Sequence, residues 1–256
     1  MTQVYFIGAG PGDPELLTLK AARIIGMADL VLYAGSLVPR AVLAEARDSA
    51  KIVDSAPLTL EEQQALVLET VRAGGLVARV HTGDPALFGA VREQAELLDR
   101  EGVDWEVVPG VSAAFAAAAA AKVSFTRPGG TQSLIVTRLA GKTPVPESEN
   151  LRDLARHGSA LAIYLSAGDA PGVQRELLAG GLDPETAVVV GHRVGWPDGS
   201  ILTTTLGDMA RAVAQAGFTR QAVFLVLPGQ GRGGRSKLYD AGFSHQYRRG
   251  SCDGST

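Results

Sequence analysis

The sequence predicts an α/β protein of two domains, the first on a mostly parallel sheet and the second on a mixed sheet. In the first half, short apolar runs alternate with helical patterns, which is typical of parallel sheets covered on both faces. In the second half, apolar runs flank the turn "GWPDGS", which indicates antiparallel pairing. A chain of 256 residues, 46% of them hydrophobic, can also bury a large core.

The strands of the first domain are expected in five apolar, often β-branched runs. They read "QVYFI", "LVLY", "KIVD", "LVARVHT" and "WEVV". Asp13 followed by Pro14 predicts the start of the first helix. Thr59 and Glu62 have the spacing of a capping box for the next helix, which Gly74 should end.

The second domain is expected in the runs "SLIVTRL", "ALAIYLS", "AVVVGHRV", "SILTTTL" and "AVFLVLPG". Helical patterns lie near 150–157, 171–180 and 207–216. We expect an N-terminal domain over 1–124, a C-terminal domain over 125–230 and a flexible tail over 231–256. In the tail, Tyr239, Phe243 and Tyr247 recur at a spacing of four, so one face of a short helix could carry all three.

Composition excludes several classes of protein. A net charge of -3 argues against a general nucleic-acid binder. The single cysteine, Cys252, excludes an internal disulfide framework and a zinc cluster, and no spacing suggests another metal site. No segment has the pattern of a targeting peptide or a membrane span. We therefore expect a cytoplasmic protein that binds neither nucleic acid nor membrane.

The opening loop, "VYFIGAGPGDPELL", tests for a dinucleotide fold. A fingerprint G-x-G-x-x-G must lead directly into a helix whose N-terminus meets the pyrophosphate. Here Gly8 and Gly10 match, but Asp13 takes the third glycine position and Pro11 removes a backbone donor. NAD(P) binding is therefore disfavoured. We expect at least one of Gly8, Gly10 and Gly12 to adopt positive φ.

Two later loops repeat the same arrangement of a strand that runs into small residues. They are "VHTGDPALFGA" at 80–90 and "VVPGVSAAFAAAA", which begins at 107. Both follow expected parallel strands, at the edge where open α/β sheets bind ligands. Their small residues would let a ligand approach the backbone closely.

Together the three loops resemble the tetrapyrrole (corrin/porphyrin) methylase family. The matching pieces are "GAGPGDPELLTLKA", "ADLVLYAGSLV", "VARVHTGDPALFGA", "VPGVSAAFAAAA", "YLS", "GHRVGWPDG" and "VFLVLPG". The pieces "TQSLIVTRLAGKTPVPE", "WPDG" and "SKLYDAGFSHQYR" are most similar to the branch that methylates precorrin-4 in cobalamin biosynthesis, with or without cobalt in the ring.

The resemblance implies S-adenosylmethionine as methyl donor, a precorrin-type tetrapyrrole as acceptor, a cofactor cleft between the two domains and a homodimer. By resemblance, the cofactor-binding residues would be Pro11, Thr82, Gly83, Asp84, Leu87, Ser112, Ala113, Tyr164, Leu165, Val194 and Pro228. Asp84 could contact the cofactor or only cap the next helix, and we favour the contact.

The acceptor carries many carboxylates, so its groove should offer cations. Candidate substrate-binding residues are Ser36, Arg40, Arg127, Arg138, Lys142 and Arg193. Related uroporphyrinogen enzymes often carry an acid after the "LY" strand, where this chain has Ala34, Gly35 and Ser36. No catalytic base is assigned. His81 is expected to be a satisfied polar residue at a strand end.

Three other functions are weighed. An NAD(P)-dependent oxidoreductase is disfavoured by Asp13, and a non-catalytic scaffold by the presence of all three loops. Within the family, diphthine synthase or a ribosomal RNA 2'-O-methylase would act on a macromolecule, and the pieces "GKTPVPE" and "SKLYDAGFSHQYR" speak against both. Whether the acceptor carries cobalt stays open.

Overall fold

The computed structural model describes residues 2–229, 234 and 236–250. These form two compact units. The first comprises the chain up to Ala116 together with Arg193–Ser200, and the second comprises Ala117–His192 and the chain from Ile201 onward. The boundary therefore falls inside helix α4 (Ala113–Ala120), earlier than the expected boundary at 124. The return of a segment from the second half to the first unit was not expected from the sequence.

The first unit is built on a five-stranded parallel sheet in the order β3-β2-β4-β1-β5. All five predicted strands are present, with bounds β1 (Val4–Gly8), β2 (Leu30–Tyr33), β3 (Lys51–Asp54), β4 (Val77–His81) and β5 (Trp105–Val108). Because every strand runs in the same direction, all the loops that follow them leave from one edge. We call it the carboxyl edge.

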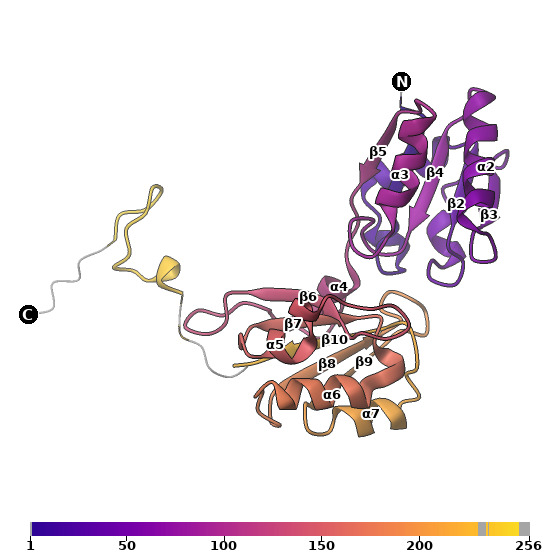
Figure 1. The fold of residues 1–256 in the computed structure, drawn as a ribbon. Helices are drawn as coiled ribbons and strands as arrows, with labels where there is room; N and C mark the ends of the chain where they lie inside the picture. The colour runs from indigo at the N-terminus through magenta and orange to yellow at the C-terminus, as the bar shows by residue number, and fades with distance from the viewer. Residues whose placement is uncertain (1, 230–233, 235, 251–256) are drawn as a thin grey trace, which may run out of the picture. The chain divides into compact units, whose positions relative to one another are not determined.

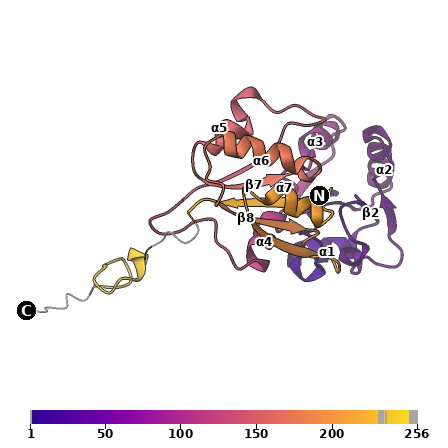
Figure 2. The same cartoon turned by 90° about the horizontal axis from the view of Figure 1, so that it is seen from below.

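Helices cover both faces of this sheet. On one face, Phe6 and Leu32 pack with Val67 of α2 (Leu60–Arg72) and Leu98 of α3 (Val91–Arg100), and Figure 1 shows these two helices on the same side of the strands. On the other face, Ile7, Val31 and Val80 pack against α1 (Leu19–Met27), which lies on the far side of β2 in Figure 2. The central strands consequently have no face left for solvent.

The helix starts show which local patterns decide the structure. The capping box is confirmed, since the Thr59 hydroxyl accepts from Glu62 N at 3.2 Å and the Glu62 carboxylate accepts from Thr59 N at 2.7 Å. The helix start predicted at Asp13 is only a three-residue 3-10 turn, η1 (Pro14–Leu16). Helix α1 begins later, where the Thr18 hydroxyl accepts from Ala21 N at 3.1 Å. A second cap was therefore available and the helix uses it.

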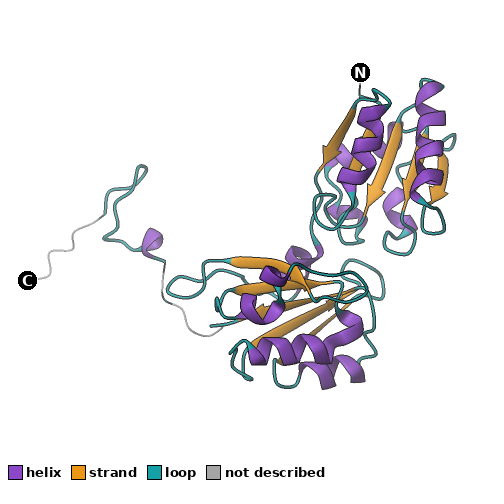
Figure 3. Ribbon diagram, viewed as in Figure 1, coloured by secondary structure: helices purple, strands orange, loops and turns teal. Residues whose placement is uncertain are grey.

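The second unit is built on a mixed sheet in the order β6-β7-β10-β8-β9. Strands β6 and β7 are parallel, and β10 runs antiparallel to β7 and β8. The strands, coloured in Figure 3, are β6 (Leu134–Arg138), β7 (Ala160–Tyr164), β8 (Ala187–His192), β9 (Ser200–Thr205) and β10 (Ala222–Leu227). They confirm the five apolar runs and the mixed sheet expected from the sequence, and β8 and β9, which flank the turn "GWPDGS", are neighbours in that sheet.

One apolar core holds this second unit together. Side chains of β7, β8 and β10, such as Ile163, Val190 and Phe224, pack with three helices. These are α5 (Leu151–Ala155), α6 (Ala170–Ala179) and α7 (Met209–Gln215). The remaining short turns are η2 (Arg40–Leu43), η3 (Glu147–Glu149), η4 (Ala167–Asp169) and η5 (Lys237–Tyr239). Among the described residues, no helix is long and apolar enough to cross a membrane.

The C-terminal segment 236–250 forms a closed loop and not the helix expected from its aromatic spacing. After η5, the only regular pairing here is a bridge between His245 and Arg248. The Arg248 guanidinium donates to the carbonyl oxygens of Leu238 at 2.8 Å and Asp240 at 2.7 Å. Backbone capture by one arginine therefore replaces helical hydrogen bonds, and Tyr247 is 87% exposed. The other parts of the expected tail lie outside the described residues.

Candidate functional site

Three loops meet at the carboxyl edge of the first unit. They follow β1, β4 and β5, which are neighbours in the sheet. The first two loops are joined by their backbones, since Gly10 N donates to Gly83 O at 3.2 Å and Gly83 N donates to Gly10 O at 2.8 Å. The recurring glycine loops of the sequence are thus one joined structure.

The Asp84 carboxylate ties the third loop to the second. One oxygen accepts from Ala86 N at 2.8 Å and the other accepts from Gly110 N at 3.0 Å. A side chain at Gly110 would collide with the carbonyl of Gly83, so only glycine permits this approach. Asp84 therefore holds backbone on both sides. Each carboxylate oxygen can still accept a further hydrogen bond, so a cofactor contact by Asp84 stays a prediction.

The opening loop is shaped by positive φ, as expected. Gly10 has φ +68° and Gly12 has φ +141°, and such conformations are costly for residues that carry a Cβ. A Cβ at Gly12 would also lie 2.5 Å from Cδ1 of Trp196. The loop leads into η1 and not directly into α1, so no α-helix N-terminus faces it as a pyrophosphate site requires.

The partner of this loop is the segment Arg193–Gly199, which we call the clasp. It joins β8 to β9 but groups with the first unit. Two backbone bonds of 2.9 Å, Trp196 N to Arg193 O and Gly199 N to Trp196 O, fold it into a tight turn. The Arg193 guanidinium pairs with Asp198 at 2.6 Å and lies 4.2 Å from the centre of the Trp196 ring. Arg193 is thus held on two sides.

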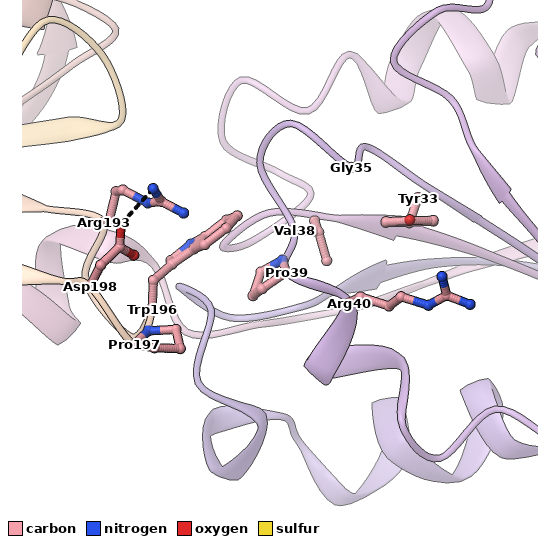
Figure 4. Close-up of a pocket in the computed structure, with 9 residues that line it drawn as sticks. All are labelled: Tyr33, Gly35, Val38, Pro39, Arg40, Arg193, Trp196, Pro197 and Asp198. Carbon is pink, nitrogen blue, oxygen red and sulfur yellow. Dashed lines mark ion pairs between the residues drawn. The ribbon is translucent and has the colours of Figure 1, made fainter.

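A pocket of about 420 Å³ lies between the clasp and the loop that follows β2. Figure 4 shows the Trp196 ring pointing toward Val38 and Pro39, with the guanidinium groups of Arg193 and Arg40 at opposite ends of the residues drawn. The lining residues are Tyr33, Gly35, Val38, Pro39, Arg40, Arg193, Trp196, Pro197 and Asp198. An apolar floor with a cation at each end suits a flat molecule that carries several carboxylates.

Most of the predicted cofactor residues belong to the first unit. Eight lie in its three loops or in the clasp: Pro11, Thr82, Gly83, Asp84, Leu87, Ser112, Ala113 and Val194. Tyr164, Leu165 and Pro228 belong to the second unit. Leu165 has φ +54° and is 70% exposed, a strained and solvent-facing conformation of the kind that persists at functional sites. Their common role as cofactor contacts stays a prediction.

The predicted substrate residues divide between two units. The structure brings Arg40 and Arg193 into one pocket of the first unit, and Ser36 lies in the same loop as the lining residue Gly35. Arg127, Arg138 and Lys142 belong to the second unit. There the Arg138 guanidinium donates to Thr143 O at 3.1 Å and Pro144 O at 2.6 Å, which braces the loop that carries Lys142.

Two buried basic side chains lie beneath the carboxyl edge, on β4. Burial lowers the pKa of Arg79 to about 10, so the guanidinium stays charged at neutral pH. Burial and the nearby Arg79 charge lower the pKa of His81 to about 3, so His81 is neutral. The His81 Nε2 has no hydrogen-bond partner among the described residues. The expectation of a satisfied histidine is therefore wrong for this nitrogen.

Sequence reasoning missed several residues of this site. Trp196 and Asp198 were considered only as part of the turn "WPDG". This turn lies between two strands of the second unit, and its sequence does not indicate that Trp196 packs on Gly12. Arg79 was not singled out, because the residues that it contacts are distant in the sequence. Among the described residues, no group of three or more His, Cys, Asp or Glu side chains could hold a metal ion.

Comparisons with known proteins agree with this geometry. Residues 3–210 match the family model of Tetrapyrrole (Corrin/Porphyrin) Methylases. A cobalt-precorrin-4 C(11)-methyltransferase of Priestia megaterium is 45% identical, over 97% of this chain and 98% of the relative. A precorrin-4 C(11)-methyltransferase of Pseudomonas aeruginosa is also 45% identical, over 96% of this chain and 99% of the relative.

Solved structures give the same result. The X-ray structure of a cobalt precorrin-4 methyltransferase matches with a TM-score of 0.86 at 46% identity, over 88% of this chain and 94% of that one. A uroporphyrin-III C-methyl transferase of Thermus thermophilus, complexed with S-adenyl homocysteine, matches with a TM-score of 0.74 at 32% identity, over 88% of this chain and 97% of that one. The chain therefore belongs to the tetrapyrrole (corrin/porphyrin) methylase family.

Proposed function

We propose that this protein transfers a methyl group from S-adenosylmethionine to C11 of precorrin-4, to give precorrin-5 in cobalamin biosynthesis. The observation that carries the proposal is similarity along nearly the whole chain to relatives named for this reaction. Those relatives divide between cobalt-precorrin-4 and precorrin-4 at the same 45% identity, so the cobalt-bearing acceptor is the alternative substrate. We further propose that the protein works in the cytoplasm as a homodimer.

The three joined loops offer partners that fit the donor. Thr82 is exposed, and Ser112 and Ala113 are partly exposed beside it on the third loop. Hydroxyl and backbone groups suit the adenosine part of the donor, and a carboxylate such as Asp84 suits the cationic part. In support, the related uroporphyrin-III enzyme was solved with S-adenyl homocysteine. We therefore assign the donor to these loops, with Tyr164, Leu165, Val194 and Pro228 as further contacts.

The pocket beside the clasp supplies the acceptor's anchoring groups. Its volume of about 420 Å³ suits one edge of a macrocycle with its carboxylate side chains, and not a whole tetrapyrrole. The Arg193 side chain is 28% exposed, so its guanidinium can still bind an acceptor carboxylate although Asp198 already pairs with it. Arg40 offers a second, exposed guanidinium. We therefore assign one edge of the acceptor to this pocket.

The reaction makes modest demands on the protein. When bound, the donor supplies a methyl group on a sulfonium; as an electron-rich ring carbon takes it in an in-line displacement, the sulfur–methyl bond breaks, S-adenosylhomocysteine leaves and the methylated ring loses a proton. The loops and the clasp would hold the two reactants in register and exclude water, and positioning of this kind can supply most of a rate enhancement. Related uroporphyrinogen enzymes often carry an acid just after the strand that ends in "LY", where this chain has Ala34, Gly35 and Ser36. We therefore assign no base.

The test combines binding and turnover. Calorimetry should find one S-adenosylhomocysteine site per chain and no NADPH binding. Replacing Arg193 or Arg40 by methionine should raise the KM for the acceptor by about tenfold, as expected for one lost charge-assisted hydrogen bond, and leave the affinity for S-adenosylhomocysteine within twofold. Equal losses for both ligands would contradict separate donor and acceptor sites.

A further inference from the structure

Arg79 is a buried cation that has no acidic partner among the described residues. The residue is 8% exposed, in the middle of β4, and burial alone accounts for the shift of its pKa to about 10. Arginine is almost never fully buried unless it is paired with an acid. A methionine of similar length would fill the same space without the cost of desolvating a charge. The hydrogen bonds that the guanidinium donates therefore explain an arginine at this position.

The Arg79 guanidinium joins four elements. Its Nε donates to Oε1 of Gln94, on α3, at 3.0 Å. One terminal nitrogen donates to Leu32 O on β2 at 3.3 Å and to the Ser55 hydroxyl at 3.1 Å. Ser55 directly follows β3, and β2 lies between β3 and β4 in the sheet. The side chain thus reaches from β4 across β2 to the end of β3.

Ser55 passes this restraint to the end of β2. Its backbone N donates to Tyr33 O at 2.7 Å and its hydroxyl donates to the same oxygen at 3.1 Å. The neighbouring Asp54 accepts from Gly35 N at 2.8 Å and from Ala56 N at 2.9 Å. A side chain at Gly35 would collide with the Asp54 carboxylate. Hydrogen bonds therefore join the backbone of 33–35 to residues 54–56, and Arg79 supports that contact through the Ser55 hydroxyl.

The restrained backbone is the rim of the acceptor pocket, because Tyr33 and Gly35 line it. We propose that Arg79 is a positioning residue for the acceptor: through Ser55 it holds the end of β2 so that Tyr33, Gly35 and the loop to Arg40 keep the shape that the acceptor requires. This inference rests on the proposed function, since it takes the pocket to be part of the acceptor site.

The chain offers a matched control for this brace. Arg47 also captures backbone, but just before the start of β2, where its Nε donates to Ala28 O at 3.0 Å and its guanidinium pairs with Asp29. It takes no part in the pocket. Substituting Arg47 by methionine therefore removes an arginine brace beside the start of β2 without touching the rim at its other end.

The experiment compares R79M, R79K and R47M in the full chain. For R79M we expect the acceptor KM to rise about tenfold, with S-adenosylhomocysteine affinity within twofold, because small misplacements at a site cost rate and binding. R79K keeps the charge but not the planar fork, so its KM should be intermediate, and it serves if R79M does not fold. Amide hydrogen exchange at Gly35 and Ser55 should be faster in R79M than in R47M, with Leu30 unchanged.

The outcomes separate this inference from the proposed function. If the KM and the exchange rates of R79M equal those of R47M while R193M raises the KM, the brace is refuted and the pocket assignment stands. If R193M and R79M both leave the KM unchanged, the pocket is not the acceptor site and the inference falls with it. If exchange at Gly35 quickens and the KM rises, with donor affinity kept, the inference is supported.

Discussion

Replacing Gly12 by alanine should destabilise the contact between the opening loop and the clasp by more than the backbone strain at Gly12 alone would cost. Gly12 has φ +141°, and a residue with a Cβ at such a φ carries strain of about 1–3 kcal/mol. The new Cβ would also lie 2.5 Å from Cδ1 and 2.7 Å from Nε1 of Trp196, and overpacking of this kind costs about 1–3 kcal/mol. We expect a total loss of about 2–6 kcal/mol in the free energy of unfolding.

Gly74 provides the matched control. It also has positive φ, +80°, but a Cβ built there meets nothing within 4 Å. Its replacement by alanine should therefore cost only the backbone term, about 1–2 kcal/mol. Urea denaturation, monitored by tryptophan fluorescence and circular dichroism, gives the free energy of unfolding of G12A and of G74A. The difference between their losses measures the cost of the clash with Trp196.

A double-mutant cycle identifies the clash directly. In a W196A background the Gly12→Ala change should lose its steric term and keep its backbone term, so the two substitutions should couple by about 1–3 kcal/mol. The reasoning is refuted if G12A costs no more than G74A, or if G12A costs the same with and without Trp196.

Three further outcomes are expected. The pKa of His81 is about 3 in the folded protein and about 6.5 in the unfolded chain. The contribution of neutral His81 to stability is therefore complete above pH 6.5 and is lost as the pH falls from there toward 3, with a loss of up to about 2 kcal/mol at pH 5. The free energy of unfolding of H81Q, measured by denaturation, should depend less on pH between 5 and 7 than that of the wild type. Asp84→Ala should weaken S-adenosylhomocysteine binding in calorimetry by about tenfold or more, and Asp84→Asn by less, because the amide oxygen can still accept from Gly110 N; equal affinity in wild type and D84A would remove Asp84 from the donor site. Truncation after Gly234 should keep the melting temperature and donor affinity but raise the acceptor KM, since segment 236–250 carries exposed aromatic and basic side chains, and an unchanged KM would show that the segment is idle.

The strands of both units could be predicted because their information is local. Runs such as Leu30–Tyr33 and Ala222–Leu227 are apolar, short and bounded by turn residues, and the capping box at Thr59 lies within four residues. The exception at Asp13 is equally local. Both caps are used there, since the Asp13 side chain accepts from Glu15 N at the start of η1 and the Thr18 side chain accepts from Ala21 N at the start of α1.

What could not be predicted depends on contacts between distant parts of the chain. No local feature of Trp196 shows that it covers Gly12, because the two residues are far apart in the sequence and Trp196 lies between β8 and β9. The burial of Arg79 is hidden for a related reason, since its partners Gln94, Leu32 and Ser55 lie 15, 47 and 24 residues away in the sequence. The short helix considered for the tail does not form, because Arg248 binds carbonyl oxygens that a helix would have used.

The proposed reaction is methylation of C11 of precorrin-4 by S-adenosylmethionine. The most direct test incubates the purified protein with S-adenosylmethionine carrying a ¹³C-methyl group and with precorrin-4 or cobalt-precorrin-4 in parallel, and then locates the label by NMR. We expect one labelled methyl group at C11 in at least one of the two products. A folded protein that binds S-adenosylhomocysteine yet labels neither acceptor, or labels another ring position, would contradict it.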